Sequence, residues 1–198
     1  MLTAALVILA GYLLGSVATA IVVARLLGLP DPRTVGSRNP GATNVLRTGG
    51  RAAAALTLAG DMLKGAVPPL AALALDGRPA VAALAACAAF LGHLYPVFFG
   101  FRGGKGVATT LGALLALSWA VGLATVGTWL AVAAAFRYSS LAAIVAAALA
   151  PGWALWLSGE PAYVAAAAFM AALLLWRHRG NMARLLAGTE DRIGARRG

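Results

Sequence analysis

Long apolar runs alternate with short polar connections along the whole chain. Most of these runs are close to the ~20 residues that cross a lipid bilayer as one helix, so they predict membrane-spanning helices. The fourth run is longer than one crossing needs and contains no charge. The predicted apolar segments are 2–24, 52–75, 79–99, 107–136, 139–157 and 161–176.

The connections between these segments differ in charge. The turns at 76–78 and at Glu160 carry little positive charge, whereas the other connections are basic. Because basic loops remain on the cytoplasmic side of a membrane, we expect Asp76, Arg78 and Glu160 to lie outside. The residues assigned to the cytoplasmic side are Arg25, Arg33, Arg38, Arg47, Arg51, Arg102, Lys105, Arg137, Arg177, Arg179, Arg184, Arg192, Arg196 and Arg197.

Segment 107–136 has basic connections at both ends, so it must return to the side that it left. We expect two short helices of about 15 residues, each ~22 Å long, with a turn near Ser118 and Trp119. The whole chain, 1–198, is then one all-α integral membrane domain. It has seven transmembrane helices, its amino terminus outside and its carboxyl terminus in the cytoplasm.

Composition agrees with a membrane protein, because 61% of the residues are hydrophobic, 11% are charged and the mean hydropathy is +0.84. The single cysteine, Cys87, lies in an apolar run, which excludes a disulfide framework or a thiolate metal cluster. In this setting the net charge of +10 favours anionic lipids and phosphorylated substrates over nucleic acid. The 6 acidic residues leave few ligands for a divalent ion, so we expect no metal and no cofactor.

The first basic connection contains V-G-S-R-N-P-G-A-T-N-V-L-R-T-G-G over residues 35–50. Its glycines free the backbone to present N–H groups, while Ser37, Thr43 and Asn44 add neutral hydrogen-bonding groups and Arg47 adds a charge. This mixture is typical of an anion-binding loop. A hydrophilic turn with helix caps is the alternative.

The second basic connection reads G-H-L-Y-P-V-F-F-G-F-R-G-G-K-G-V-A-T-T over residues 92–110. Glycines surround Lys105 and open onto a predicted helix, so N–H groups, a helix terminus and an ammonium group can converge on phosphate. The spacing is not that of a Walker A loop. His93 fits a structural role as well as a catalytic one. The glycines are Gly103, Gly104 and Gly106.

Two further polar groups lie beyond this loop. Ser139 and Ser140 begin a helix, where an N-cap is the first interpretation and a substrate contact the second. In the tail, His178 and Asn181 are three residues apart and share a helix face. The arginines around them are also typical of a segment that contacts anionic lipid headgroups.

Asp61 and Lys64 are ionisable residues within the second apolar segment. An ionisable group at membrane depth is a functional candidate. The two residues are also spaced to neutralise each other, in which case they position the adjoining loops.

Together these motifs resemble the bacterial acyl-phosphate-dependent glycerol-3-phosphate acyltransferase family, known as PlsY. Two positions differ from the family pattern, because Arg38 stands where glycine is frequent and Gly180 where an acidic residue is frequent. The resemblance is carried by G-S-R-N-P-G-A-T-N-V-L-R, D-M-L-K-G, G-H-L-Y-P-V-F-F-G-F-R-G-G-K-G-V-A-T, R-Y-S-S-L and H-R-G-N-M-A-R-L-L-A-G-T-E.

The resemblance implies a seven-helix enzyme of the bacterial inner membrane whose motifs lie at the cytoplasmic face. Its implied reaction transfers a fatty acyl group from acyl-phosphate to the sn-1 hydroxyl of glycerol 3-phosphate. The products are lysophosphatidic acid and phosphate, in phospholipid biosynthesis. The family's functional residues map onto Ser37, Arg47, the loop 103–106, His178, Asn181 and Glu190.

Both implied substrates carry phosphate, so we divide the candidate residues between two anions. Ser37, Lys105 and His178 are the expected catalytic residues. Glycerol 3-phosphate is assigned to Arg47, Lys105, Ser140, His178 and Asn181. Acyl-phosphate is assigned to Ser37, Thr43, Asn44, Gly103, Gly104 and Gly106. His93, Asp61, Lys64 and Glu190 are the expected supporting residues.

No nucleophile–base–acid set stands out, so we expect direct attack by the glycerol hydroxyl group. Its proton then passes to His178, to His93 or to the departing phosphate, whereas an acyl-enzyme on Ser37 would need a positioned base. The expected partners are the two substrates and membrane lipids, without an obligatory protein partner.

Three alternative functions predict different features. A phosphate transporter should show repeat symmetry, a CDP-alcohol phosphotransferase should show clustered aspartates, and a lipid-binding scaffold should show no turnover.

Overall fold

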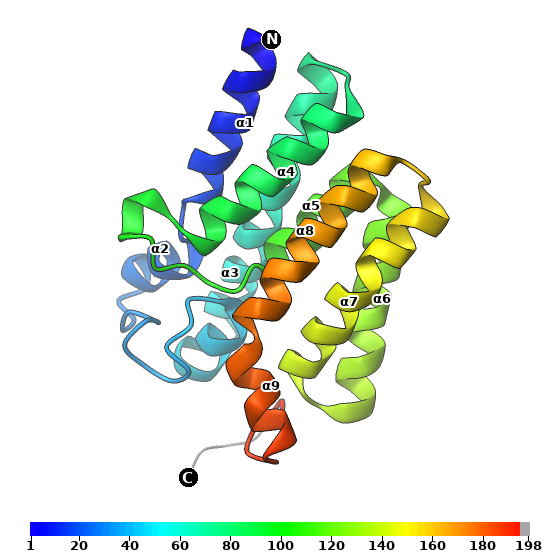
Figure 1. Ribbon diagram of the computed structural model, residues 1–198. Coiled ribbons are helices and arrows are strands. Elements are labelled where there is room, and N and C mark those ends of the chain that lie inside the picture. The colour runs from blue at the N-terminus through cyan, green and yellow to red at the C-terminus, as the bar shows by residue number, and fades with distance from the viewer. Residues whose placement is uncertain (195–198) are drawn as a thin grey trace.

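The computed structural model describes residues 1–194, which contain helices and no strand. The long helices stand side by side, with the amino terminus at one end of the bundle and the last helix at the other (Figure 1). The helices are α1 (Leu2–Gly15), α2 (Thr19–Leu26), α3 (Ala42–Leu75), α4 (Pro79–Leu94), the short 3-10 helix η1 (Val97–Phe99), α5 (Val107–Leu117), α6 (Trp119–Phe136), α7 (Ser139–Leu157), α8 (Pro161–Arg177) and α9 (Arg179–Leu186).

The expected all-helical membrane fold is confirmed within residues 1–194. By length and composition, α3, α4 with η1, α6 and α7 can each cross a membrane, and α1 with α2 can form a fifth, bent span. The apolar helices α5 and α8 are shorter, with 11 and 17 residues. The seven-span count and the orientation of the termini therefore remain predictions.

The first apolar segment is two helices that meet at 46°, so the expectation of one helix over 2–24 is wrong. Gly15, at the end of α1, lies so close to the backbone of Ala89 that a Cβ atom there would clash. Beyond the break, the Nζ of Lys64 donates a hydrogen bond of 2.8 Å to the carbonyl of Val17. The bend is stable because a side chain from α3 satisfies a backbone group near the break.

Segment 107–136 turns at Ser118, where we expected it to turn. Ser118 has an extended backbone (φ −156°, ψ 113°) and separates the two helices. The expectation of two equal arms is wrong, because α5 has 11 residues and α6 has 18. Directly after the turn, Gly122 of α6 packs against Leu115 of α5, where a larger residue would clash.

Small residues let the central helices approach closely. α4 is the most buried of the candidate spans, and Ala82, Ala85, Ala86 and Ala89 are all fully or almost fully enclosed. Where α3 crosses α5, a Cβ at Gly65 would clash with the carbonyl of Thr109, and one at Gly112 would clash with the carbonyl of Met62. Close backbone approach of this kind is typical of helices that associate within membranes.

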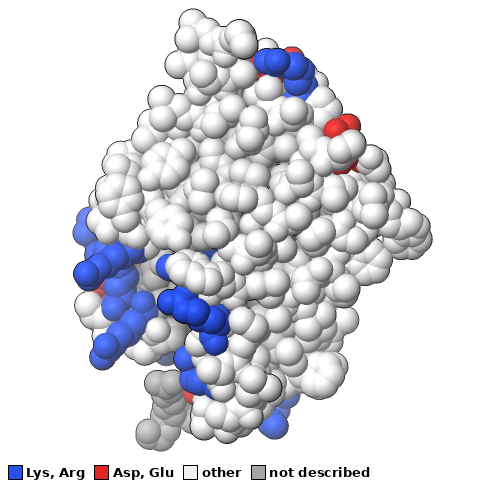
Figure 2. All heavy atoms as spheres, viewed as in Figure 1, with Lys and Arg blue, Asp and Glu red and all other residues white. Residues whose placement is uncertain are grey.

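The two ends of the bundle differ in charge, as the sequence predicts. On the face shown in Figure 2, the lysine and arginine side chains gather mainly at the end that holds α2 and α9, whereas the α3–α4 and α7–α8 turns lie at the opposite end (Figure 1). The basic residues Arg196 and Arg197 lie outside the described residues. The described part of the chain therefore places its polar motifs at one end, where the site can form.

Candidate active site

A cavity of about 630 Å³ opens at the basic end of the bundle, and its walls come from α3, α5, α6, α7, α9 and the loops between them. Its polar part collects side chains from all four motif regions that the sequence singles out. The polar walls are formed by Ser37, Asn39, Thr43, Asn44, Arg47, Lys105, Ser139, Ser140, His178, Asn181, Arg184, Glu190 and Asp191.

The same cavity continues between the helices as an apolar channel. One wall belongs to α3, another to α5 and a third to α6. Leu58 and Leu130 on these walls are 43% and 56% exposed, so the channel reaches the lipid-facing side of the bundle. A ligand that fills both parts must have a polar head and a long apolar tail. The apolar walls include Ala54, Ala55, Leu58, Met62, Val107, Ala108, Leu111, Val126, Trp129, Leu130 and Ala143.

Asn44 holds the first motif loop together. Its Oδ1 accepts a hydrogen bond of 2.9 Å from the N–H of Ser37, and its Nδ2 donates to the carbonyls of Pro32 (2.9 Å) and Val35 (3.1 Å). The side chain is 2% exposed. The oxygen and the nitrogen of this amide group both have partners within the loop, so the structure shows the loop-forming role of Asn44 directly. A contact between Asn44 and a substrate remains a prediction.

Ser37, Thr43 and Arg47 also belong to this first motif and line the cavity. The hydroxyl groups of Thr43 and Ser139 lie 3.2 Å apart, which joins the motif to the start of α7. The N-cap of α7 is Tyr138, without a side-chain capping bond, so the N-cap interpretation of Ser139 and Ser140 is wrong. Both serines instead face the cavity, as the substrate-contact alternative requires.

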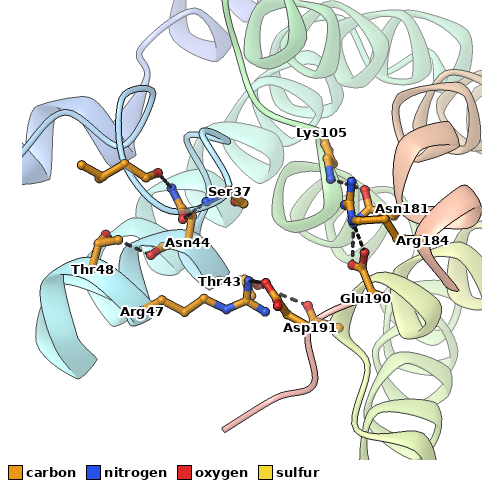
Figure 3. Close-up of polar contacts among 12 residues, drawn as sticks. Ser37, Thr43, Asn44, Arg47, Thr48, Lys105, Asn181, Arg184, Glu190 and Asp191 are labelled. Carbon is orange, nitrogen blue, oxygen red and sulfur yellow. Dashed lines mark hydrogen bonds and ion pairs between the residues drawn. The ribbon is translucent and has the colours of Figure 1, made fainter. Parts of the chain in front are cut away.

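Lys105 lies at the centre of a polar chain between the glycine loop and the tail (Figure 3). Its Nζ donates to Oδ1 of Asn181, whose Nδ2 donates to Oε1 of Glu190 (2.6 Å). The Nε of Arg184 donates to the other carboxylate oxygen of Glu190 (2.7 Å). Burial lowers the pKa of Lys105 from 10.5 to about 8, although the Glu190 carboxylate opposes this change. The ammonium group is therefore charged at pH 7.

The glycine loop is held from both sides. The N–H of Gly103 donates to the carbonyl of Leu94 and that of Gly104 to the carbonyl of His93, both at 3.2 Å. Their own carbonyls each accept a 3.0 Å hydrogen bond from Arg177. Of the three glycines around Lys105, only Gly106 lines the cavity. Phosphate binding by the other two N–H groups remains a prediction and requires those groups to leave their present partners.

His178 lies in the cavity wall between α8 and α9 and is 3% exposed. Its Nδ1 is 2.8 Å from the carbonyl of Leu174, and a carbonyl can only accept, so Nδ1 carries a proton in this contact. Burial lowers the pKa of His178 from 6.5 to about 4, although the Leu174 carbonyl raises it. The imidazole is therefore neutral at pH 7, and its Nε2 can accept a hydrogen bond.

Asp61, Lys64 and His93 form a buried cluster, and Asp61 and His93 line the cavity. Oδ1 of Asp61 is 2.8 Å from Nζ of Lys64 and 3.5 Å from Nδ1 of His93. Lys64 also binds the α1–α2 break, and a Cβ at Gly104 would clash with Nε2 of His93. These contacts support the positioning alternative for the cluster, because it connects the helix break with the glycine loop.

Glu190 lines the polar part of the cavity. Burial raises the pKa of its carboxyl group, but Ser140, Asn181 and Arg184 beside it lower the pKa below the usual 4.5. Glu190 is thus an anion at neutral pH, and it orients Asn181 and Arg184. The motif resemblance points to Glu190 as a functional residue. The partners of its carboxylate are known only from the folded structure.

Sequence reasoning missed two contacts that shape this site. Arg177 binds the carbonyls of the glycine loop, and Oδ2 of Asp191 is 3.0 Å from Nη1 of Arg47. A basic residue beside a membrane helix and an acid next to Glu190 carry no local signal for either contact. Only the return of the tail over the first motif brings Asp191 and Arg47 together.

Comparison with known proteins now decides the family. Residues 5–188 match the family described as "Glycerol-3-phosphate acyltransferase". The chain belongs to the glycerol-3-phosphate acyltransferase family. Relatives of that name include one from Thioalkalivibrio sulfidiphilus, which is 60% identical over 98% of this chain and 96% of its own length, and one from Halorhodospira halophila, which is 58% identical over 96% of both.

The fold of this acyltransferase is similar to that of PlsY, described as an integral membrane glycerol 3-phosphate acyltransferase. The crystal structure of its glycerol 3-phosphate form superposes with a TM-score of 0.92, at 42% identity and 96% coverage of both chains. The lysophosphatidic acid form gives 0.90, at 41% identity and 96% and 95% coverage. The resemblance drawn from the motifs is confirmed, and with it a place in phospholipid biosynthesis.

The two positions that differ from the expected motif pattern, Arg38 and Gly180, lie in different surroundings. Arg38 has φ +56°, in the left-handed region that glycine adopts without strain. Gly180, the other difference, lies in the first turn of α9 and outside the cavity walls.

Proposed function

We propose that this acyltransferase transfers a fatty acyl group from acyl-phosphate to the sn-1 hydroxyl of glycerol 3-phosphate. The products are lysophosphatidic acid and inorganic phosphate. The observation that carries the proposal is one cavity with a cationic polar part and an apolar channel between helices. Such a cavity suits a donor that combines a phosphate head with a long acyl chain, next to a small phosphorylated acceptor.

In the proposed arrangement, the cationic groups offset the repulsion between two phosphate groups held close together. Glycerol 3-phosphate binds Arg47, Lys105, Ser140, His178 and Asn181, which all line the cavity. Acyl-phosphate binds Ser37, Thr43 and Gly106, with Asn44 shaping the loop and Gly103 and Gly104 behind it. Holding the two reactants in an attack geometry supplies a large part of the rate enhancement.

The proposed chemical step is direct attack. The glycerol oxygen forms a bond to the acyl carbon, the bond from that carbon to the phosphate oxygen breaks, and the phosphate leaves. Neutral His178 accepts a hydrogen bond from the attacking hydroxyl group and orients it, but a pKa of about 4 makes it a weak base. A phosphate group, whose second pKa is about 6, is the stronger base, so the proton passes to the departing phosphate. Lys105 stabilises the charge on that phosphate.

A covalent acyl-enzyme on Ser37 has less support. It needs a base next to the serine hydroxyl group. His93 lies in the cluster with Asp61 and against Gly104, and His178 contacts the carbonyl of Leu174. We therefore give Ser37 the role of a hydrogen-bond donor to acyl-phosphate.

We further propose that the enzyme lies in the bacterial inner membrane as one domain, with the cavity open to the cytoplasm. The basic residues at the end of the bundle that holds α2 and α9 (Figure 2) support this orientation through the positive-inside rule. The acyl chain then enters from the lipid, and the polar acceptor enters from the cytoplasm.

A donor-competition assay tests the proposal. Purified protein in lipid nanodiscs receives glycerol 3-phosphate with palmitoyl-phosphate, palmitoyl-CoA or palmitoyl-acyl carrier protein, and lysophosphatidic acid is identified by mass. We expect turnover with palmitoyl-phosphate alone, and the same rate in EDTA without divalent ions. Turnover with either rival donor but not with palmitoyl-phosphate would overturn the donor assignment. Loss of activity in EDTA that magnesium restores would overturn metal independence.

A further inference from the structure

The tail of the chain turns back over the polar part of the cavity. α9 ends with two backbone bonds, from the N–H of Gly188 to the carbonyl of Leu185 (3.2 Å) and from the N–H of Thr189 to the carbonyl of Arg184 (2.9 Å). Gly188 has φ +69°, which completes the usual glycine-terminated end of a helix. This turn directs residues 189–194 back toward the first motif, and we call them the strap.

The strap places two carboxylates among the cations of the site. Glu190 contacts Asn181 and Arg184, and Asp191 pairs with Arg47 (Figure 3). Together these two carboxylates carry two negative charges, as a fully ionised phosphate group does. The protein's own acids therefore stand where the proposed function requires the phosphate of a substrate.

The two acids differ in how firmly they are held. The Glu190 side chain is 9% exposed and bridges Asn181 and Arg184. The side chains of Arg47 and Asp191 are 29% and 33% exposed, and ion pairs that water reaches are weak. Asp191 is thus the acid that an incoming phosphate can displace, whereas Glu190 stays in the wall.

The strap is also anchored beyond Asp191. The N–H of Ile193 donates to the carbonyl of Arg137 (2.6 Å), and the guanidinium of Arg137 donates to the carbonyl of Ile193 (3.1 Å). Arg192 donates to the hydroxyl group of Tyr138 (3.1 Å) and lies over its ring. These contacts fasten the strap to the α6–α7 turn, so Asp191 stays close to Arg47 after displacement and returns when the phosphate leaves.

We propose that Asp191 is an internal competitor of substrate phosphate for Arg47. It neutralises Arg47 in the empty site, lowers the affinity for glycerol 3-phosphate and favours release of phosphorylated products. The inference rests on the proposed function for the identity of the phosphate ligand. Asp191 acts through Arg47 and is therefore a positioning residue, which sets affinity rather than the chemical step.

The test compares charge-removing and charge-keeping variants of Asp191. Asp191→Asn and Asp191→Ser remove the charge, Asp191→Glu keeps it, and Asp31→Asn is the matched control. Asp31 pairs with Arg33 in a similarly exposed ion pair outside the cavity walls, so its variant has the same loss of one negative charge. Glycerol 3-phosphate and inorganic phosphate are each titrated by calorimetry into purified protein without an acyl donor, and thermal unfolding confirms that each variant is folded.

We expect Asp191→Asn and Asp191→Ser to bind both ligands about two- to fivefold more tightly, because an exposed ion pair no longer has to break. Asp191→Glu and Asp31→Asn should bind like the unmodified protein. In the acyl-transfer assay, Asp191→Asn should lower KM for glycerol 3-phosphate by the same factor, without an increase in kcat. Competitive inhibition by phosphate should become stronger.

Unchanged or weaker binding in the folded Asp191→Asn and Asp191→Ser variants would overturn the inference, since a purely structural strap predicts that result. Tighter binding by Asp31→Asn of equal size would also overturn it, because a general charge effect would then explain the gain. Failure of the proposed function is a separate result. It would appear as no lysophosphatidic acid from the unmodified protein, while the phosphate titrations still report on Asp191.

Discussion

Lys105 is a largely buried ammonium group that lies beside the proposed phosphate groups. It is held by Asn181 and lies on the cavity wall in front of α5. Lys105→Ala should leave the protein folded but lower kcat/KM for glycerol 3-phosphate about 30- to 1000-fold, the equivalent of about 2–4 kcal/mol. Steady-state kinetics at constant donor concentration measures this change. Near-normal kinetics would remove Lys105 from the active site and leave the phosphates to the first motif and the tail.

The lowered pKa of Lys105 predicts an alkaline limit to activity. In the proposed function the ammonium form of Lys105 binds phosphate, and burial lowers the pKa of that group to about 8. Below pH 8 the charge is present; as the pH rises through 8 the proton is lost, so kcat/KM for glycerol 3-phosphate should fall. A pH profile of kcat/KM measures this limb, since that ratio reports the free enzyme. In Lys105→Arg the side chain stays charged, so whatever activity remains should lack the limb; an identical limb would assign it to another group.

At the scale of elements, the crossing of α3 and α5 sets the shape of the cavity, since both helices line its apolar channel. Gly65 lies against the carbonyl of Thr109, without room for a methyl group. Gly65→Ala should therefore force the helices apart and lower the free energy of unfolding by about 1–3 kcal/mol. Thermal unfolding in detergent should show a reduced midpoint.

Gly152→Ala is the matched control for this change, because a Cβ at that position in α7 would meet open space, with no atom within 4 Å beyond the adjacent residues and the backbone of its own helix. It should leave the midpoint unchanged or raise it slightly, since alanine is the better helix former. If both variants lowered the midpoint equally, backbone effects rather than the α3–α5 contact would explain the loss.

At the scale of the whole molecule, the charge difference between the two ends predicts how the chain lies in the membrane. In a Cys87→Ala background, single cysteines at positions 76 and 160 should react with an impermeant thiol reagent added outside spheroplasts. Cysteines at positions 102 and 137 should react only after the membrane is opened. Positions 102 and 137 must share a side if α5 and α6 form a returning pair, so labelling on opposite faces would contradict the seven-span prediction.

Local patterns in the sequence determine a large part of this protein. Apolar runs without charge can only be buried in lipid or in one another, so they determine the all-helical fold and the boundaries of α7 and α8 within a residue. The matching charge at both ends of 107–136 predicts a return, and the chain turns at Ser118, where the turn was expected. The return to the same side of the membrane stays a prediction. The polar motifs mark the residues that line the cavity, because buried polar groups inside a membrane protein gather where a ligand binds.

Tertiary structure decided how these polar groups are used. The break between α1 and α2 is held by Lys64, which belongs to another helix. The amide group of Asn44 forms its hydrogen bonds within its own loop. The N–H groups of the glycine loop face α4, and Asp191 reaches Arg47 across 144 residues of sequence. Hydropathy and motif spacing describe neighbours along the chain, whereas a hydrogen-bonding group takes whichever partner the packed helices bring within about 3 Å. That choice is made between distant segments, so only the folded chain shows it.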